Sequence, residues 1–171
     1  MRRLGPALLL GLAILAAGCG FEPLYGQRRG DAGTTAQLAA VEVAAIPDRL
    51  GQQVRNRLLE LLAPRGGQRR PRYRLDVQLR QEKTGLLVES DDTASRINLT
   101  LSANFALTDL RSREPVFDGR TRTIAAYNIT RADYANLVAE RDAGRRAAET
   151  VAEEIAAQLA VFFKRQQEAR Q

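Results

Sequence analysis

The clearest pattern in the chain is an alternation of apolar and polar side chains from residue 97 to residue 108. The apolar series is Ile97, Leu99, Leu101, Ala103, Phe105 and Leu107. The intervening series is Asn98, Thr100, Ser102, Asn104, Ala106 and Thr108. Because successive side chains of a strand point to opposite faces, this pattern predicts a long strand in a sheet with one covered face and one polar face.

Three further segments show the same period of two. Residues 38–46 alternate through Val41, Val43 and Ala45, and longer strands are expected over residues 72–88 and 116–129. Short polar turns join the three strands between residues 72 and 129. These three strands are therefore predicted to form an antiparallel meander.

Two segments repeat apolar residues at helical spacing. The first runs from about residue 48 to 63, where Asp48 follows Pro47 as a start signal and Pro64 ends the helix. The second begins after Thr130, which is expected to cap it, and continues to about Lys164. The order β-α-β-β-β-α predicts an α+β fold, a two-layer sandwich with two helices on one face of a four-stranded mixed sheet. Residues 38–171 would form this single domain.

The N-terminus has the order of a secretory signal. Arg2 and Arg3 precede an apolar stretch from Leu4 to Leu15, and the small residues 16–18 follow directly before Cys19. The apolar stretch is shorter than the roughly 20 residues that a spanning helix needs. Residues 1–18 are therefore expected to be a signal peptide that is removed.

Cys19 is the only cysteine in the chain, so it cannot form an internal disulfide. Small residues before a cysteine at a cleavage point resemble a bacterial lipobox, although Ala16 stands where leucine is more usual. We therefore expect a covalent lipid on Cys19 and a lipidated tether over residues 19–37. An ordinary signal peptide with a chance cysteine is the alternative. Since Gly20 replaces the aspartate typical of inner-membrane retention, the resemblance implies a lipid anchor on the periplasmic side of the outer membrane.

The amino-acid composition limits the classes of partner that the protein can bind. The formal net charge is +6, and Lys83 and Lys164 are the only lysines among 26 basic residues. Export makes anionic lipid a more sensible partner than nucleic acid. The basic loop with Arg65, Arg69, Arg70, Arg72 and Arg74 is either a lipid-phosphate patch or a solvated turn.

The chain has no histidine, which removes the usual general base and, with a single cysteine, any site ligated by His or Cys. The adjacent pairs Asp91-Asp92 and Glu153-Glu154 should diverge from one another. We therefore expect no enzyme, no metal, and no cofactor other than the covalent lipid on Cys19.

Several short motifs together resemble the LptE family of lipopolysaccharide (LPS) assembly lipoproteins, especially those of alphaproteobacteria. These are Cys19-Gly20-Phe21 with Pro23-Leu24-Tyr25-Gly26, the turn Asp92-Thr93-Ala94, the long strand with Asn104, and the closing helix with Ala147-Ala148. The resemblance implies a protein that plugs the lumen of the outer-membrane β-barrel LptD. It also implies that the protein helps this barrel to assemble and assists the insertion of LPS into the outer leaflet.

The resemblance suggests which residues meet these partners. The polar face of the long strand would face the barrel, through Asn98, Thr100, Ser102 and Asn104. The family's basic lipid-contacting positions fall near Ser90 and Glu140, neither of which is basic here. Arg96 is the nearest substitute, with Arg120 and Arg122 behind it as further LPS-binding candidates.

Two other functions fit parts of the pattern. One is a periplasm-facing lipoprotein that assists a lipid or ligand transporter without a barrel partner, which requires an apolar pocket between the helices and the sheet. The other is a hydrolase that uses Asp91 or Asp92.

Overall fold

The computed structural model describes residues 29–63, 70–86 and 95–169. A mixed sheet with the strand order β1-β2-β3-β4 forms one layer of the domain. The strands are β1 (Val41–Val43), β2 (Tyr73–Leu86), β3 (Ser95–Asp109) and β4 (Glu114–Ile129). β1 is parallel to β2, whereas β2, β3 and β4 form the expected antiparallel meander. We call the end of the sheet that carries β1 proximal and the end where Leu86 pairs with Arg96 distal.

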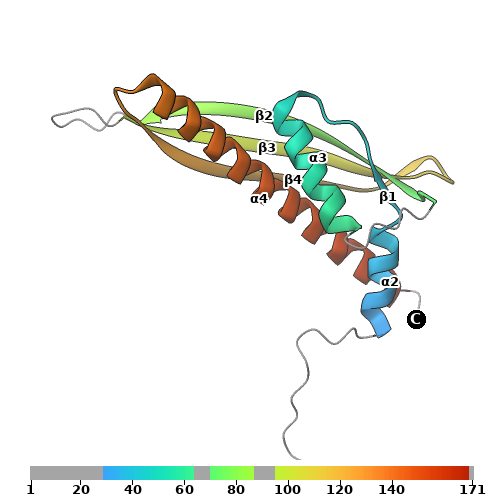
Figure 1. The fold of residues 1–171 in the computed structure, drawn as a ribbon. Coiled ribbons are helices and arrows are strands. Elements are labelled where there is room, and N and C mark those ends of the chain that lie inside the picture. The colour runs from blue at the N-terminus through green and yellow to red at the C-terminus, as the bar shows by residue number, and fades with distance from the viewer. Residues whose placement is uncertain (1–28, 64–69, 87–94, 170–171) are drawn as a thin grey trace, which may run out of the picture.

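Within the described residues, the helices lie on one face of this sheet (Figure 1). They are α3 (Asp48–Leu62) and the long α4 (Asp133–Glu168), and a third helix, α2 (Arg29–Leu38), packs against the C-terminal part of α4 near the proximal end. The predicted α+β class and element order are therefore confirmed. The expected number of helices was wrong, because α2 occupies part of the segment that was predicted to be a tether.

Three predicted boundaries differ from the structure. The strand expected over residues 38–46 is limited to Val41–Val43, because α2 continues to Leu38. α4 begins at Asp133, and Ala132 is its N-cap residue without a side-chain cap. Thr130 instead donates its backbone N–H to Asn136 Oδ1 at 2.7 Å.

The third difference is at the start of α3, where Asp48 was expected to cap the helix but makes no side-chain cap. Pro47 holds the N-cap position of α3, and Asp48 has a φ of 66°. Aspartate is one of the few residues that adopt this left-handed conformation at low cost. The start of α3 is thus marked by a change of backbone direction rather than by the predicted cap.

The hydrophobic core lies between the helices and the facing side of the sheet. Its largest fully buried side chains come from both layers: Val54, Leu58, Tyr73, Leu75, Leu99, Leu101, Leu107, Val151, Ile155, Leu159 and Phe163. The apolar series of the long strand contributes every second residue of β3, as its alternation predicts. A chain of aromatic contacts closes the proximal end, with ring centroids of Phe163 and Tyr73 5.1 Å apart and those of Phe162 and Phe117 4.9 Å apart.

Two glycines allow close approach of α3 to its neighbours. A Cβ atom at Gly51 would lie 2.7 Å from Ile46 Cγ2 and 2.9 Å from the Ile46 carbonyl oxygen. A Cβ atom at Gly144 of α4 would lie 3.0 Å from Leu50 Cδ2. Since interiors pack without spare volume, these positions set how closely α3 can lie against Ile46, in the connection between β1 and α3, and against α4.

Candidate functional site

No helix of the described residues lies over the other face of the sheet (Figure 1), and we call it the uncovered face. The strand register lines up its side chains in rows that run across β2, β3 and β4. In one row Gln78 pairs with Asn104, which pairs with Arg120. In the next row towards the distal end, Arg80 pairs with Ser102, which pairs with Arg122. This face is therefore a broad polar surface built from three long strands.

The two arginines of β4 carry unneutralised positive charge on this face. Arg120 and Arg122 are both exposed, and neither side chain makes an ion pair with any residue in the described ranges. Arg80, at the other side of the same surface, pairs with Glu82 at 2.8 Å. The middle rows are therefore positively charged along β4 and close to neutral along β2.

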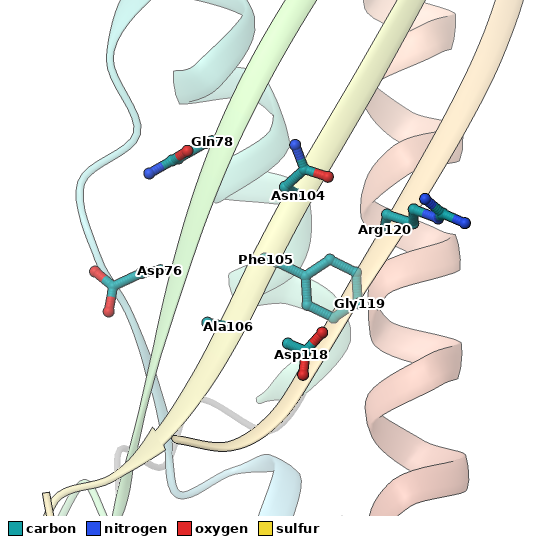
Figure 2. Close-up of a pocket in the computed structure, with 8 residues that line it drawn as sticks. All are labelled: Asp76, Gln78, Asn104, Phe105, Ala106, Asp118, Gly119 and Arg120. Carbon is teal, nitrogen blue, oxygen red and sulfur yellow. The ribbon is translucent and has the colours of Figure 1, made fainter. Parts of the chain in front are cut away.

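The proximal part of the uncovered face has the opposite character. Asp76 and Asp118 flank the small Ala106 in one row, and Asp76 pairs with Arg74 at 3.2 Å. Together with Gln78, Asn104 and Arg120 they line an open concavity of about 540 Å³ (Figure 2). A ligand or protein surface placed here would meet carboxylates, amides and a guanidinium within a few strand positions.

Gly119 lets β4 lie beside β3 at this concavity. Phe105 also lines the concavity, and its ring lies beside the backbone of Gly119 (Figure 2). A Cβ atom at Gly119 would lie 2.5 Å from Phe105 Cζ. Gly119 therefore keeps Asp118 in register with Ala106 and Arg120 in register with Asn104 while a large side chain lies beside it.

All four predicted barrel-facing residues lie on the uncovered face. Asn104 is exposed, and Asn98 and Ser102 are half-buried. Thr100 is only 6% exposed, because Glu82 and Ile124 stand on either side of it in its row. Ile124 itself is 57% exposed. It gives the polar surface an apolar spot near its centre.

The three predicted LPS-binding arginines do not form one cluster. Arg120 and Arg122 are neighbours on the uncovered face, but Arg96 lies in the row of Leu86 and Asn128 near the distal end. Six residues of β3 separate Arg96 from the Arg122 row, which is roughly 20 Å of strand. A single phosphate could therefore meet Arg120 and Arg122 together, but not Arg96 as well.

A partly exposed polar network near the distal end involves Lys83, which was not predicted to be a site residue. Lys83 of β2 pairs with Glu140 of α4, and the Tyr127 hydroxyl donates to Glu140 Oε2 at 3.4 Å. Burial raises the pKa of Tyr127, and the nearby Glu140 charge adds to this shift. Glu140 is thus neutralised by Lys83. Because Lys83 and Glu140 are 57 positions apart, the local sequence around either residue does not predict their contact.

The structure describes only some of the residues that the sequence singled out. Cys19, Ser90, Asp91, Asp92, Arg65 and Arg69 lie outside the described residues. In the basic loop, Arg72 pairs with Asp109 at 3.4 Å and lies over the Tyr73 ring, while Arg74 pairs with Asp76. The pKa of Asp109 is lowered, first by the hydrogen bond from the Arg111 backbone N–H and then by the charge of Arg72. In the described part of this loop, Arg72 and Arg74 therefore have intramolecular partners.

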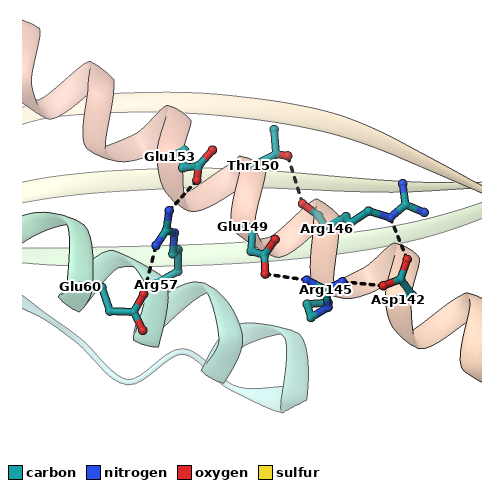
Figure 3. Close-up of polar contacts among 8 residues, drawn as sticks. All are labelled: Arg57, Glu60, Asp142, Arg145, Arg146, Glu149, Thr150 and Glu153. Atoms are coloured by element: carbon teal, nitrogen blue, oxygen red, sulfur yellow. Dashed lines mark hydrogen bonds and ion pairs between the residues drawn. The ribbon is translucent and has the colours of Figure 1, made fainter.

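The helix layer shows charge compensation on its outer surface (Figure 3). Arg57 of α3 bridges Glu60 at 3.1 Å and Glu153 of α4 at 2.8 Å. Arg145 pairs with Asp142 at 2.6 Å, and Arg146 pairs with the same carboxylate at 3.0 Å. These two guanidinium groups lower the pKa of Asp142 through their hydrogen bonds. Glu153 is therefore part of an ion-pair network that joins α3 and α4.

The described ranges hold neither a metal-binding cluster of His, Cys, Asp or Glu residues nor a membrane-spanning helix. No group of three or more His, Cys, Asp or Glu residues there is placed to hold a metal ion. No helix in those ranges has the length and hydropathy needed to cross a membrane.

The fold and the uncovered face together define a class, namely a small α+β scaffold domain that presents a long polar sheet surface. The family model described as LptE, lipopolysaccharide-assembly, matches residues 35–159. The chain therefore belongs to the LptE family, and it is a lipoprotein of LPS assembly.

Solved structures agree with this assignment. A protein described as a lipoprotein of Caulobacter crescentus CB15 is 27% identical with a TM-score of 0.64, over 77% of this chain and 96% of the other. A minor lipoprotein of Acinetobacter baumannii is 18% identical with a TM-score of 0.52, over 71% of this chain and 90% of the other. The second likeness shows the fold alone. No curated protein sequence matches.

Proposed function

We propose that this protein is the lipid-anchored plug of an LptD-type outer-membrane barrel and assists LPS insertion into the outer leaflet. The observation that carries the proposal is the uncovered face, which offers three long strands of polar side chains to a partner. Porin-type barrels have polar interiors, so the rows around Ser102 and Asn104 match such a lumen in chemistry. LptE family membership supplies the LPS-assembly context.

The positions of the arginines along the sheet support separate contacts, with the barrel through Arg120 and Arg122 and with LPS through Arg96. Arg120 and Arg122 share rows with Asn104 and Ser102, so a barrel wall placed on this face would also contact both arginines. Arg96, near the distal end, then serves as the LPS-facing cation of the described residues, because a guanidinium binds phosphate oxygens in a bidentate manner.

The packing of the domain argues against the transporter alternative. That function requires an apolar pocket between helices and sheet, yet this interlayer space holds the fully buried side chains of Leu58, Leu101, Ile155 and their neighbours. The concavity of about 540 Å³ lies on the uncovered face, where the charged Asp76, Asp118 and Arg120 stand around Phe105 and Ala106. This arrangement suits a protein surface better than an acyl chain.

A photocrosslinking scan tests the barrel contact. A photoreactive amino acid placed in turn at Asn98, Thr100, Ser102 and Asn104 of the full chain should crosslink to one large outer-membrane barrel in cells. The same probe at Glu154, which is exposed on the outer side of α4, should give no such product. Absence of barrel crosslinks from all four face positions would refute the plug proposal.

Replacement of Cys19 tests the anchor. Because one thiol is the proposed attachment point for lipid, Cys19→Ala should abolish incorporation of labelled palmitate into the chain and leave an uncleaved or soluble form. Cell fractionation and metabolic labelling measure both effects. As a matched control, Gly20→Asp should keep the palmitate label but move the protein to the inner membrane. Persistent labelling of the Cys19→Ala variant would count against lipidation at this residue.

A further inference from the structure

The turn between β3 and β4 holds an arginine in a backbone conformation that disfavours it. Arg113 has a φ of 61°, in the left-handed region that glycine adopts without steric cost. Its backbone N–H donates to the Asp109 carbonyl at 2.8 Å, which closes the turn. The side chain is exposed and makes no ion pair within the described ranges. Since the packing of the domain does not use this guanidinium, the backbone strain points to a use on the outside of the molecule.

Three more residues lie near Arg113, and we call the four together the proximal tip: Arg70, Leu110, Arg111 and Arg113. Leu110 donates its N–H to the Arg72 carbonyl at 2.9 Å, which places the chain just before β2 beside the turn. Arg70 and Arg111 are exposed, and neither makes an ion pair in the part of the chain that the structure describes. Leu110 is 39% exposed. The turn lies at the proximal end of the sheet (Figure 1).

The carboxylates near the proximal tip leave most of its charge unbalanced. Asp109 pairs with Arg72 at 3.4 Å, so that carboxylate is already neutralised. Glu114 is exposed and is the other acidic residue of the turn. Three arginines therefore stand against one free carboxylate, with an apolar side chain among them. Cationic residues around an exposed apolar side chain are typical of protein segments that contact anionic lipid headgroups.

The proximal tip lies at the end of the domain that a lipid on Cys19 would hold. Ten residue steps separate Cys19 from the start of α2 at Arg29, a reach of at most about 36 Å. α2 packs against the C-terminal part of α4 near the proximal end (Figure 1). β2 alone is 14 residues long, which puts the distal end about 45 Å further away. The anchored leaflet therefore faces the proximal end.

From these observations we propose that the proximal tip contacts anionic phospholipid headgroups of the leaflet that carries the anchor, an inference that rests on the proposed lipid at Cys19. The guanidinium groups of Arg111 and Arg113 bind lipid phosphates, and Leu110 enters the boundary between headgroups and acyl chains. The tip lies beyond the rows of the uncovered face. One domain can therefore present that face to a barrel wall and its proximal tip to the headgroups around the periplasmic rim of the barrel.

Fluorescence quenching tests the contact in vesicles that contain no barrel. The chain has no tryptophan, so Ser112→Trp introduces a single indole into the turn. The full lipidated chain is reconstituted with a headgroup spin-labelled lipid, in phosphatidylcholine alone or in a mixture with phosphatidylglycerol. Quenching should be several-fold stronger in the mixture, and it should be lost at about 1 M salt, where the Debye length is only about 3 Å. Asn128→Trp, at an exposed position near the distal end, should show little quenching in either.

Charge variants in the Ser112→Trp background identify the residues that make the contact. Arg111→Glu should lower the quenching in the mixed vesicles by about fivefold or more, the usual effect of one basic residue beside an anionic leaflet. Arg141→Glu makes the same charge change at an exposed position of α4 and should leave the quenching unaltered. Arg113→Gly should lower the quenching without lowering the melting temperature, since glycine removes both the charge and the backbone strain. A purely structural Arg113 would not separate the two measurements.

Three results would overturn the proposal, each for a different reason. Equal quenching in the two vesicle types, or quenching that Arg111→Glu and Arg113→Gly leave unchanged, would mean that the anchor alone holds the turn at the membrane. If both variants lost the barrel on co-purification while the quenching stayed the same, the proximal tip would face protein rather than lipid. Failure of every variant to float with the vesicles would refute the anchor itself, a result that differs from flotation without quenching.

Discussion

Phe163→Ala is expected to lower the free energy of unfolding by about 3–5 kcal/mol, the usual cost of removing a fully buried aromatic ring. Phe163 has no exposed surface, and its ring lies 5.1 Å from that of Tyr73 and 5.2 Å from that of Phe162. It therefore joins the C-terminal part of α4 to the start of β2. Urea denaturation followed by circular dichroism measures the loss.

Val161→Ala provides the matched control for this substitution. Val161 lies two residues away on the same helix but is 50% exposed, so its truncation should change stability by no more than about 0.5 kcal/mol. A loss below about 1.5 kcal/mol for Phe163→Ala would show that the proximal aromatic contacts do not hold α4 on the sheet.

The regular periodicities of the chain predicted most of the fold. The alternation through Leu99, Leu101 and Phe105 placed the covered face of β3 correctly, because a period of two has one interpretation in a long strand. Helical spacing likewise located α3 and α4 to within a few residues. Long amphipathic elements carry their own burial pattern, so one sequence is sufficient to recognise them.

α2 was not predicted, for a physical reason. Its sequence includes Gly30, Gly33 and two threonines, which are poor helix formers, and it has no clear apolar stripe. The helix packs against α4, where the Thr34 hydroxyl donates to Gln167 Oε1 at 3.1 Å. Helices of this length depend on tertiary contacts, which local patterns do not contain.

The sequence predicted which face of β3 carries the candidate site. It did not predict which residues of β2 and β4 lie in the same row as each β3 residue. Alternation alone placed Ser102 and Asn104 on the polar side of β3. The pairing of Asn104 with Gln78 and Arg120 depends on the register of three strands, and a register shift between Leu107 and Thr108 alters the β3–β4 pairing near the proximal end. For the same reason the opposite charges of Asp76 and Arg120 come to line one concavity only in the folded sheet.

Ser102→Trp is expected to abolish co-purification of the barrel protein while leaving the domain folded. Ser102 lies at the centre of the uncovered face, between Arg80 and Arg122 in its row. An indole there projects away from the core, so thermal stability should change little. In the proposed complex it would separate the sheet from the barrel wall across several rows. We therefore expect at least about a tenfold loss of retained barrel, equivalent to about 1.4 kcal/mol.

Glu154→Trp is the matched control, because Glu154 is exposed on the opposite layer of the domain. It adds the same side chain to the outer surface of α4, so non-specific effects of an exposed indole should appear in both variants. Quantitative affinity purification from detergent-solubilised membranes compares them with the unmodified chain. If α4 faced the barrel instead, Glu154→Trp would lose the barrel and Ser102→Trp would retain it. The pair of variants therefore distinguishes which layer of the sandwich makes the contact.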